Sequence, residues 1–115
     1  MAKKRILGVI GLGHVGAHVA YALAVQGIAD ELILIDKNAQ KLASEIQDLR
    51  DAAAYFPHRV SFQAGEFSDL GECDVIVNCV GKIELLRESH DRTTEMDFTI
   101  PAVRGFAEKI RESGF

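Results

Sequence analysis

Apolar and polar residues are grouped in successive segments along this chain, and the pattern predicts β-strands that alternate with α-helices. Short apolar runs, bounded by glycine or polar residues, predict β-strands that are covered by other elements. The predicted strands are residues 5–10, 31–36, 59–64 and 73–80. Three longer segments have the composition or the spacing of helices. The predicted helices are residues 14–26, 39–54 and 94–113.

The pattern within each segment also predicts what the element faces. Residues 14–26 are apolar almost all round, so this helix is expected to be buried rather than amphipathic. In residues 39–54 the apolar side chains keep to one stripe, which is expected to face the sheet. Residues 73–80 have the character of a strand that is covered on both faces. Pro101 is expected to kink or divide the last helix.

The order of the elements predicts an α/β fold. Residues 65–72 are short for a parallel crossover and are expected to hold a turn of helix around residues 67–70. Right-handed crossovers give a Rossmann-type parallel sheet of strand order 3-2-1-4, with helices on both faces and no fifth strand. Residues 1–115 are expected to form one domain. The sheet changes direction between the first and fourth strands, so a ligand crevice is expected over residues 11–16 and 80–82.

Three glycines follow the first strand in the pattern G-x-G-x-x-G. Gly11 allows a tight turn, and Gly13 leaves room for a pyrophosphate against the backbone. Gly16 allows the next helix to pack closely on the sheet, and that helix offers free N–H groups to phosphates. A glycine-rich turn alone can be ordinary loop structure. Here the strand, the helix and a later acidic residue agree, so the pattern predicts a dinucleotide site.

The acidic residue is Asp36, which ends the second strand 20 positions after Gly16. A carboxylate at this place accepts hydrogen bonds from ribose hydroxyls and repels a 2′-phosphate, which selects NAD over NADP. Lys37 and Lys41 lie near enough to weaken this selection without reversing it.

The composition of the chain limits the kinds of partner that can be expected for it. The net charge is −4 and the basic cluster Lys3-Lys4-Arg5 is short, so no nucleic-acid partner is expected. No apolar run approaches the length of a membrane span and no signal peptide is evident, so no membrane partner and a cytoplasmic location are expected. Cys73 and Cys79 form neither a metal pattern nor a disulfide framework, so no metal site is expected.

Four stretches together resemble the lactate/malate dehydrogenase superfamily. They are residues 11–16 (GLGHVG), 36–41 (DKNAQK), 43–49 (ASEIQDL) and the strand end Val80-Gly81. The resemblance covers essentially the whole chain, and residues 73–85 look most like the L-2-hydroxyisocaproate dehydrogenase branch. It implies NAD as the cofactor and hydride transfer between NAD and a small 2-hydroxy/2-oxo acid.

The resemblance also implies roles on the cofactor side. Val15 would give its backbone N–H to the pyrophosphate, Asp36 would bind the adenine-side ribose, and Lys41 would lie beside that half of the cofactor. The end of the fourth strand would run along the centre of the cofactor. The implied cofactor-binding residues are Gly11, Gly13, His14, Val15, Gly16, Asp36, Lys41, Val80 and Gly81.

Arg92 matches the mobile-loop arginine of this superfamily, which the resemblance makes the catalytic residue of the chain. A guanidinium near the substrate carbonyl stabilises the negative charge that develops on oxygen as hydride arrives. Without the resemblance, a solvated or helix-capping arginine would be the simpler interpretation. In the same loop, Leu85 and Leu86 suit an apolar substrate tail, whereas Arg87 suits a second carboxylate.

None of the four histidines matches the acid/base histidine of the superfamily. His14 and His18 have a spacing that could bind a metal ion, but no third ligand is evident. The chain is therefore expected to be the N-terminal, cofactor-binding part of a longer dehydrogenase that binds NAD weakly without turnover. Residues 73–80 would form an exposed sheet edge. A homo-oligomer is expected through this edge or through the helix at residues 39–54, which the superfamily uses in subunit contacts. Two alternatives stay open: a non-catalytic NAD-sensing regulatory domain, and an unrelated Rossmann enzyme that uses NADP.

Overall fold

A four-stranded parallel sheet forms the centre of the molecule. The computed structural model describes residues 2–82, Glu88 and residues 91–115. The strand order is β3-β2-β1-β4, and every neighbouring pair is parallel. The strands are β1 (Ile6–Ile10), β2 (Glu31–Ile35), β3 (Ser61–Ala64) and β4 (Val75–Asn78). The α/β class and the strand order predicted from the sequence are confirmed. The strands β1, β2 and β3 are one or two residues shorter at one end than predicted, and β4 is two residues shorter at both ends.

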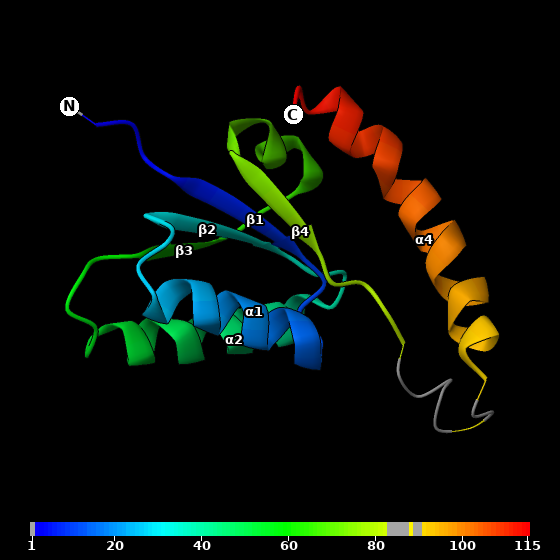
Figure 1. Ribbon diagram of the computed structural model, residues 1–115, viewed down its shortest axis with the longest axis horizontal. Helices are drawn as coiled ribbons and strands as arrows, with labels where there is room; N and C mark the ends of the chain where they lie inside the picture. The colour runs from blue at the N-terminus through cyan, green and yellow to red at the C-terminus, as the bar shows by residue number, and fades with distance from the viewer. Residues whose placement is uncertain (1, 83–87, 89–90) are drawn as a thin grey trace.

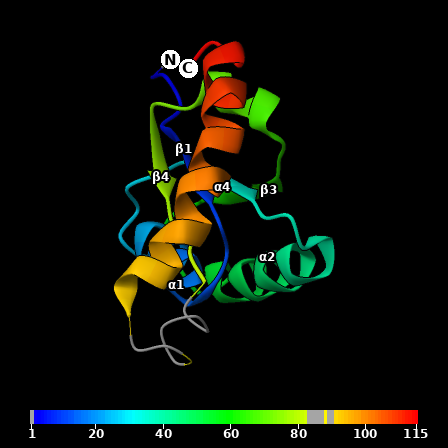
Figure 2. The same ribbon diagram turned by 90° about the vertical axis from the view of Figure 1, so that its right-hand side faces the viewer.

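Helices cover both faces of the sheet (Figure 1). Two of them, α1 (His14–Val25) and α2 (Ala39–Ala53), lie on one face. The 3₁₀ helix η1 (Phe67–Glu72) and the long helix α4 (Arg92–Glu112) lie on the other, as a view turned by 90° also shows (Figure 2).

Successive strand side chains fill the two interfaces in turn, because neighbouring residues of a strand point to opposite faces. In β2, Leu32 and Leu34 belong to the core on the side of α1 and α2. Ile33 and Ile35 belong to a second core that includes Leu70 of η1 and residues of α4. The continuous apolar run of β2 in the sequence thus reflects burial on both faces.

The crossover from β3 to β4 is short because η1 packs directly on the sheet. A Cβ added to Gly8 of β1 would lie 2.7 Å from Leu70 Cδ2, so the missing side chain admits this leucine, which is fully buried. Asp69 starts the turn by accepting a hydrogen bond from the Glu66 N–H at 2.7 Å. The predicted turn of helix is therefore present and extends to Glu72.

The helix α4 runs without interruption from Arg92 to Glu112 and contains Pro101. The prediction that Pro101 divides this helix is wrong, and so is the placement of Arg92 in the preceding loop. The side chain of Asp91 accepts a hydrogen bond from the Thr93 N–H at 2.9 Å, which caps the helix at this point. None of the helices in the described residues is long and apolar enough to cross a membrane.

Two predictions about burial are wrong. The helix α1 buries only Gly16, Ala20 and Ala24, whereas Val15 is 66% exposed. The strand β4 is half-exposed, and Val75 is 51% exposed. The reason is the same in both cases. Within the described residues β4 pairs with β1 alone, and α1 has the sheet on one side and α2 beside it, so their other surfaces meet solvent.

Candidate cofactor site

The turn after β1 is held against the ends of two neighbouring strands. Gly11 has a φ of +91°, which favours glycine, and its N–H donates to the Ile35 carbonyl at 2.8 Å. A Cβ at Gly11 would lie 3.0 Å from the backbone nitrogen of Val80. A Cβ at Gly16 would lie 1.7 Å from the Gly11 carbonyl oxygen. Both glycines are therefore required by the packing of the turn itself.

Gly13 differs from these two glycines. Its φ is −73°, which other residues adopt readily, and a Cβ added there would meet nothing within 4 Å. The packing of the domain thus gives no reason for a glycine at this position. A ligand that approaches the backbone would give one, as the sequence pattern predicts for a pyrophosphate.

The N-terminus of α1 is left open, unlike those of α2 and α4. Its N-cap is Gly13, which has no side chain to bond, and its first turn contains no acidic residue. The helix α2 is capped by Asn38, whose Oδ1 accepts from the Lys41 N–H at 3.1 Å, and α4 by Asp91. Since the first N–H groups of a helix have no partner within the helix, those of α1 remain available to an anion.

The carboxylate of Asp36 joins the glycine turn to the start of α2. Its Oδ2 accepts a hydrogen bond from the Leu12 N–H at 2.7 Å, and its Oδ1 accepts one from the Asn38 N–H at 2.8 Å. Each carboxylate oxygen can accept more than one hydrogen bond, so ribose hydroxyls can still be bound. The acid therefore fixes the glycine turn to the start of α2.

The end of β4 completes the site. The Val80 N–H donates to Asn78 Oδ1 at 3.0 Å, which shapes the chain as it leaves the strand. Two residues later, the Lys82 N–H donates to Glu95 Oε2 at 3.2 Å and links the strand end to α4. A Cβ at Gly81 would lie 3.3 Å from the same Glu95 oxygen. The structure thus brings Gly11 and Val80 together, whereas Gly81 lies against α4.

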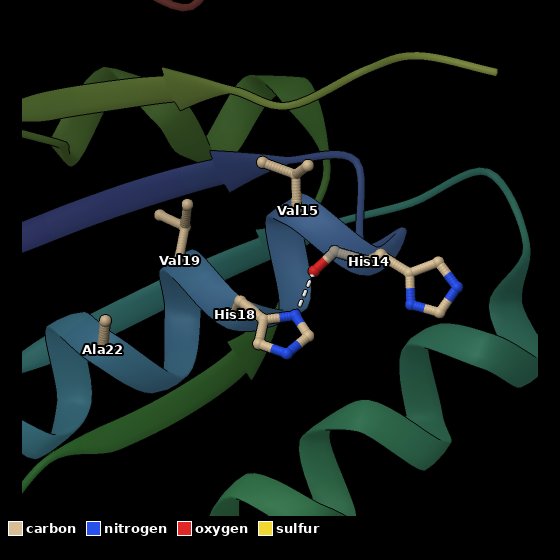
Figure 3. A pocket seen from close by; sticks show the side chains of 5 residues that line it. All are labelled: His14, Val15, His18, Val19 and Ala22. Carbon is tan, nitrogen blue, oxygen red and sulfur yellow. Dashed lines mark hydrogen bonds between the residues drawn. The ribbon is translucent and has the colours of Figure 1, made fainter. Parts of the chain in front are cut away.

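Two open hollows flank the first turns of α1. One of about 410 Å³ is lined by His14, Val15, His18, Val19 and Ala22 (Figure 3). The other, of about 500 Å³, is lined by Gly13, His14, Ala17, His18, Tyr21, Lys41 and Glu45. The second hollow brings Lys41 of α2 to the same surface as Gly13, and His14 and Val15 border the first. These predicted cofactor residues therefore share one end of the molecule.

The histidines near this end and the two cysteines of the chain do not form a reactive cluster. His18 Nδ1 donates to the His14 carbonyl at 2.5 Å, and the two imidazole rings lie apart in Figure 3. Within the described residues, no group of three or more His, Cys, Asp or Glu side chains could hold a metal ion. Burial raises the pKa of the Cys79 thiol, and burial together with nearby carboxylates raises the pKa of Cys73 to about 11. Both thiols are therefore held in the protonated, unreactive form at neutral pH.

Arg92 is placed by its backbone at the first position of α4, and its side chain lies outside the described part of the chain. Leu85, Leu86 and Arg87 also lie outside it. The structure adds residues that sequence reasoning missed, because Phe98 of α4 contacts the side chains of Lys37 and Lys82. Both lysines directly follow predicted site residues. No signal in the sequence shows that a residue of α4 reaches them.

The parallel sheet, the open helix N-terminus behind a glycine turn and the acid at the end of β2 define a dinucleotide-binding domain of the Rossmann type. The family description "lactate/malate dehydrogenase, NAD binding domain" matches residues 5–110. The chain belongs to this family, and its cofactor is NAD.

Individual relatives agree with this assignment. The L-lactate dehydrogenase of Fusobacterium nucleatum is 32% identical over 115 residues, which are 100% of this chain and 35% of that protein. The enzyme of the same name from Geobacillus stearothermophilus is 35% identical over 107 residues, 93% of this chain and 33% of that protein. The minor L-lactate dehydrogenase of Enterococcus mundtii, in its ligands-bound form, has a TM-score of 0.88 at 28% identity and covers 97% of this chain and 35% of that one. The chain thus spans about a third of the length of the relatives that it matches.

Proposed function

We propose that this chain is the NAD-binding part of a 2-hydroxy-acid dehydrogenase, with lactate as the substrate. The observation that carries the proposal is the open N-terminus of α1. Gly13 leaves space above the backbone, no side chain caps the helix, and Asp36 stands at the ribose position. These residues fit a pyrophosphate and its ribose, and the family match supports the assignment.

In this proposal, each residue has a physical task. The first N–H groups of α1 hold the pyrophosphate, Asp36 holds the adenine-side ribose, and Val80 with Gly81 supports the middle of the dinucleotide. A bound NAD would supply the hydride acceptor for the hydroxy acid, and a bound NADH would supply the hydride donor for the oxo acid. Arg92 stabilises the negative charge that develops on the substrate oxygen. We further propose that the proton-transferring histidine, its aspartate partner and the arginine for the substrate carboxylate belong to further polypeptide beyond these residues.

The choice of lactate follows the names of the relatives, which are L-lactate dehydrogenases. The sequence itself favoured 2-hydroxyisocaproate, a longer and branched acid, through the character of residues 73–85. Leu85 and Leu86 would suit that substrate, but they lie outside the described residues. Pyruvate and 2-oxoisocaproate are therefore the two oxo acids to compare.

The test separates binding from turnover. The 115-residue chain is titrated with NADH, and binding is followed through nucleotide fluorescence. It is then incubated with NADH and either pyruvate or 2-oxoisocaproate. We expect saturable NADH binding and no steady oxidation of NADH. Absence of NADH binding by the folded chain would overturn the cofactor assignment, and steady turnover would overturn the division of the catalytic groups. In a longer protein that contains this sequence, preference for pyruvate would support lactate as the substrate.

A further inference from the structure

The carboxylate of Glu95 links α4 to the chain that leaves β4. Its Oε2 accepts a hydrogen bond from the Lys82 N–H at 3.2 Å. The same oxygen would lie only 3.3 Å from a Cβ added at Gly81, so the side chain of Glu95 lies directly against the backbone there. Glu95 is half-buried, and it comes one helical turn after the first residue of α4.

This contact fixes the chain where the sheet no longer holds it. The Cys79 N–H donates to the Ile10 carbonyl at 2.8 Å, which ties the chain to β1 up to that residue. The next hydrogen bond, from the Val80 N–H to Asn78 Oδ1, is local and shapes the chain without tying it to another element. The bond from Lys82 to Glu95 joins residues that are 13 positions apart, so it anchors the strand end to a helix.

The bond also matters for the helix, because two apolar side chains in the first turns of α4 are open to solvent. Met96 and Ile100 are 47% and 40% exposed, whereas Phe106 in the second half stacks on Phe67 with ring centres 5.5 Å apart. Helices in proteins are stabilised mainly by apolar burial, so a polar contact has a larger share in fixing the first turns than the last ones. The order of the strand end and the order of these first turns are therefore linked through Glu95.

We propose that Glu95 is a positioning residue for the cofactor, because it holds the backbone at Gly81 and Lys82 in the path that a bound dinucleotide requires. The inference rests on the proposed function, which puts Val80 and Gly81 along the middle of the dinucleotide. A strand end that is already fixed need not be ordered on binding, so the apparent affinity is higher. The coupling acts in both directions, so a bound dinucleotide stabilises the first turns of α4 in return.

The proposal assigns this role to an oxygen that accepts a hydrogen bond, and not to a negative charge. Glu95→Gln keeps such an oxygen, whereas Glu95→Ala removes it. Asp97→Ala is the matched control, because it removes an acidic side chain from an exposed position of the same helix. Loss of a carboxylate alone would strengthen the binding of an anionic dinucleotide. A loss of affinity in Glu95→Ala would therefore have the opposite sign to the effect of charge.

The experiment measures NADH affinity by nucleotide fluorescence, and amide hydrogen exchange with and without saturating NADH. Glu95→Ala is expected to bind NADH about threefold to tenfold more weakly than the wild type, as for the loss of one hydrogen bond. Glu95→Gln and Asp97→Ala are expected to stay within about threefold of the wild type. Saturating NADH should slow exchange of residues 96–100 at least about threefold in the wild type and in Glu95→Gln, but not in Glu95→Ala.

Three results would overturn this inference and leave the proposed function standing. They are NADH binding by Glu95→Ala as tight as that of the wild type, an equal loss of affinity in Glu95→Gln and Glu95→Ala, and exchange of residues 96–100 that NADH does not change in the wild type. If the folded wild type does not bind NADH, the proposed function fails, and the inference fails with it. Circular dichroism and exchange of residues 106–110 without nucleotide, expected to be the same in all variants, show that the compared proteins share one fold.

Discussion

At the scale of the residue, the glycines of the turn have separable roles. Gly11 and Gly16 are explained by the domain's own packing, because a side chain at either would press on neighbouring backbone. Gly13 has room for a side chain and a backbone conformation that does not need glycine. The glycine pattern can therefore be tested, because Gly11 and Gly16 serve the fold, whereas Gly13 serves ligand binding in the proposed function.

A pair of substitutions should separate these roles. Gly16→Ala is expected to lower the free energy of unfolding by more than about 2 kcal/mol, since its methyl group would overlap the Gly11 carbonyl. Gly13→Ala is expected to cost no more than about 1 kcal/mol, the usual penalty of a poorer N-cap. It should nevertheless weaken NADH binding at least about tenfold, because its methyl group occupies the approach of the pyrophosphate. Urea unfolding and NADH titration of both variants provide the measurements. Unchanged NADH affinity in a folded Gly13→Ala variant would contradict this reading of the turn.

The sequence predicts this turn well because its chemistry is local. The spacing of the three glycines and of Asp36 follows from the geometry of one strand, one turn and one helix. It does not show that Asp36 also accepts hydrogen bonds from the Leu12 and Asn38 N–H groups. It also does not show that Phe98 reaches Lys37 and Lys82, since that contact depends on where a distant helix packs.

At the scale of the element, the two halves of α4 pack against the rest of the domain to different extents. Its C-terminal half packs against η1, where Phe106 stacks on Phe67 with ring centres 5.5 Å apart. Its N-terminal half exposes Met96 and Ile100, which are 47% and 40% exposed. Burial of apolar side chains supplies most of the stability of a helix in a protein, so the two halves should differ in local stability.

Hydrogen exchange should detect this difference. In the wild-type chain at neutral pH, amides of residues 96–100 are expected to exchange at least about tenfold faster than those of residues 106–110, after correction for intrinsic rates. A variant Phe106→Ala should remove the stacked contact and bring the protection of the second segment toward that of the first. Equal protection of both segments in the wild type would show that α4 opens as one unit.

At this scale, the sequence predicts which helices and strands form, but it does not predict which of their surfaces other elements cover. Asn38 correctly marks the start of α2, because a cap acts on the next few residues of the chain. The exposure of Val15 on α1 and of Val75 on β4 was missed. An apolar side chain indicates the tendency to be covered, whereas actual burial depends on which other elements are present to cover it.

At the scale of the whole molecule, one ion pair joins the amino ends of β1 and β2. Asp30 accepts hydrogen bonds from the Arg5 guanidinium at 2.9 and 3.1 Å and from the Arg5 N–H at 2.8 Å. These bonds lower the pKa of Asp30 from its ordinary 3.8 to about 2. A carboxyl group with a lowered pKa stabilises the folded state when it is ionised.

The pH dependence of stability should follow from this pair. The contribution of Asp30 is expected to be complete above about pH 4 and to be lost as the pH falls through about 2. The variant Asp30→Asn should therefore have a lower Tm at pH 6 and a shallower fall of Tm between pH 4 and pH 2. Because the pair is exposed, added salt should reduce the difference. Asp48→Asn, at an exposed position of α2, is the control. A wild-type Tm that falls no more steeply than that of Asp30→Asn would contradict the prediction.

The exposed edge of the sheet predicts how copies of the chain meet. The strand β4 contains no charged residue and pairs only with β1 in the described residues, so its outer backbone groups can pair with a second copy. We expect the 115-residue chain to self-associate with rising concentration in light scattering. Val75→Lys should lower the average mass without changing the circular dichroism, because a charged edge resists pairing. Val25→Lys, on the exposed side of α1, is the matched control. If Val25→Lys alone lowers the mass, the contact lies on the helices instead.

The two hydrogen bonds that Asp36 accepts limit which substitutions this position can accept during evolution. The same carboxylate supports the glycine turn and, in the proposed function, binds the ribose, so a replacement that alters ribose binding also loosens the turn. Mutations at this position therefore carry a folding penalty that selection would oppose. A substitution of Asp36 is consequently expected only in backgrounds that have already gained stability.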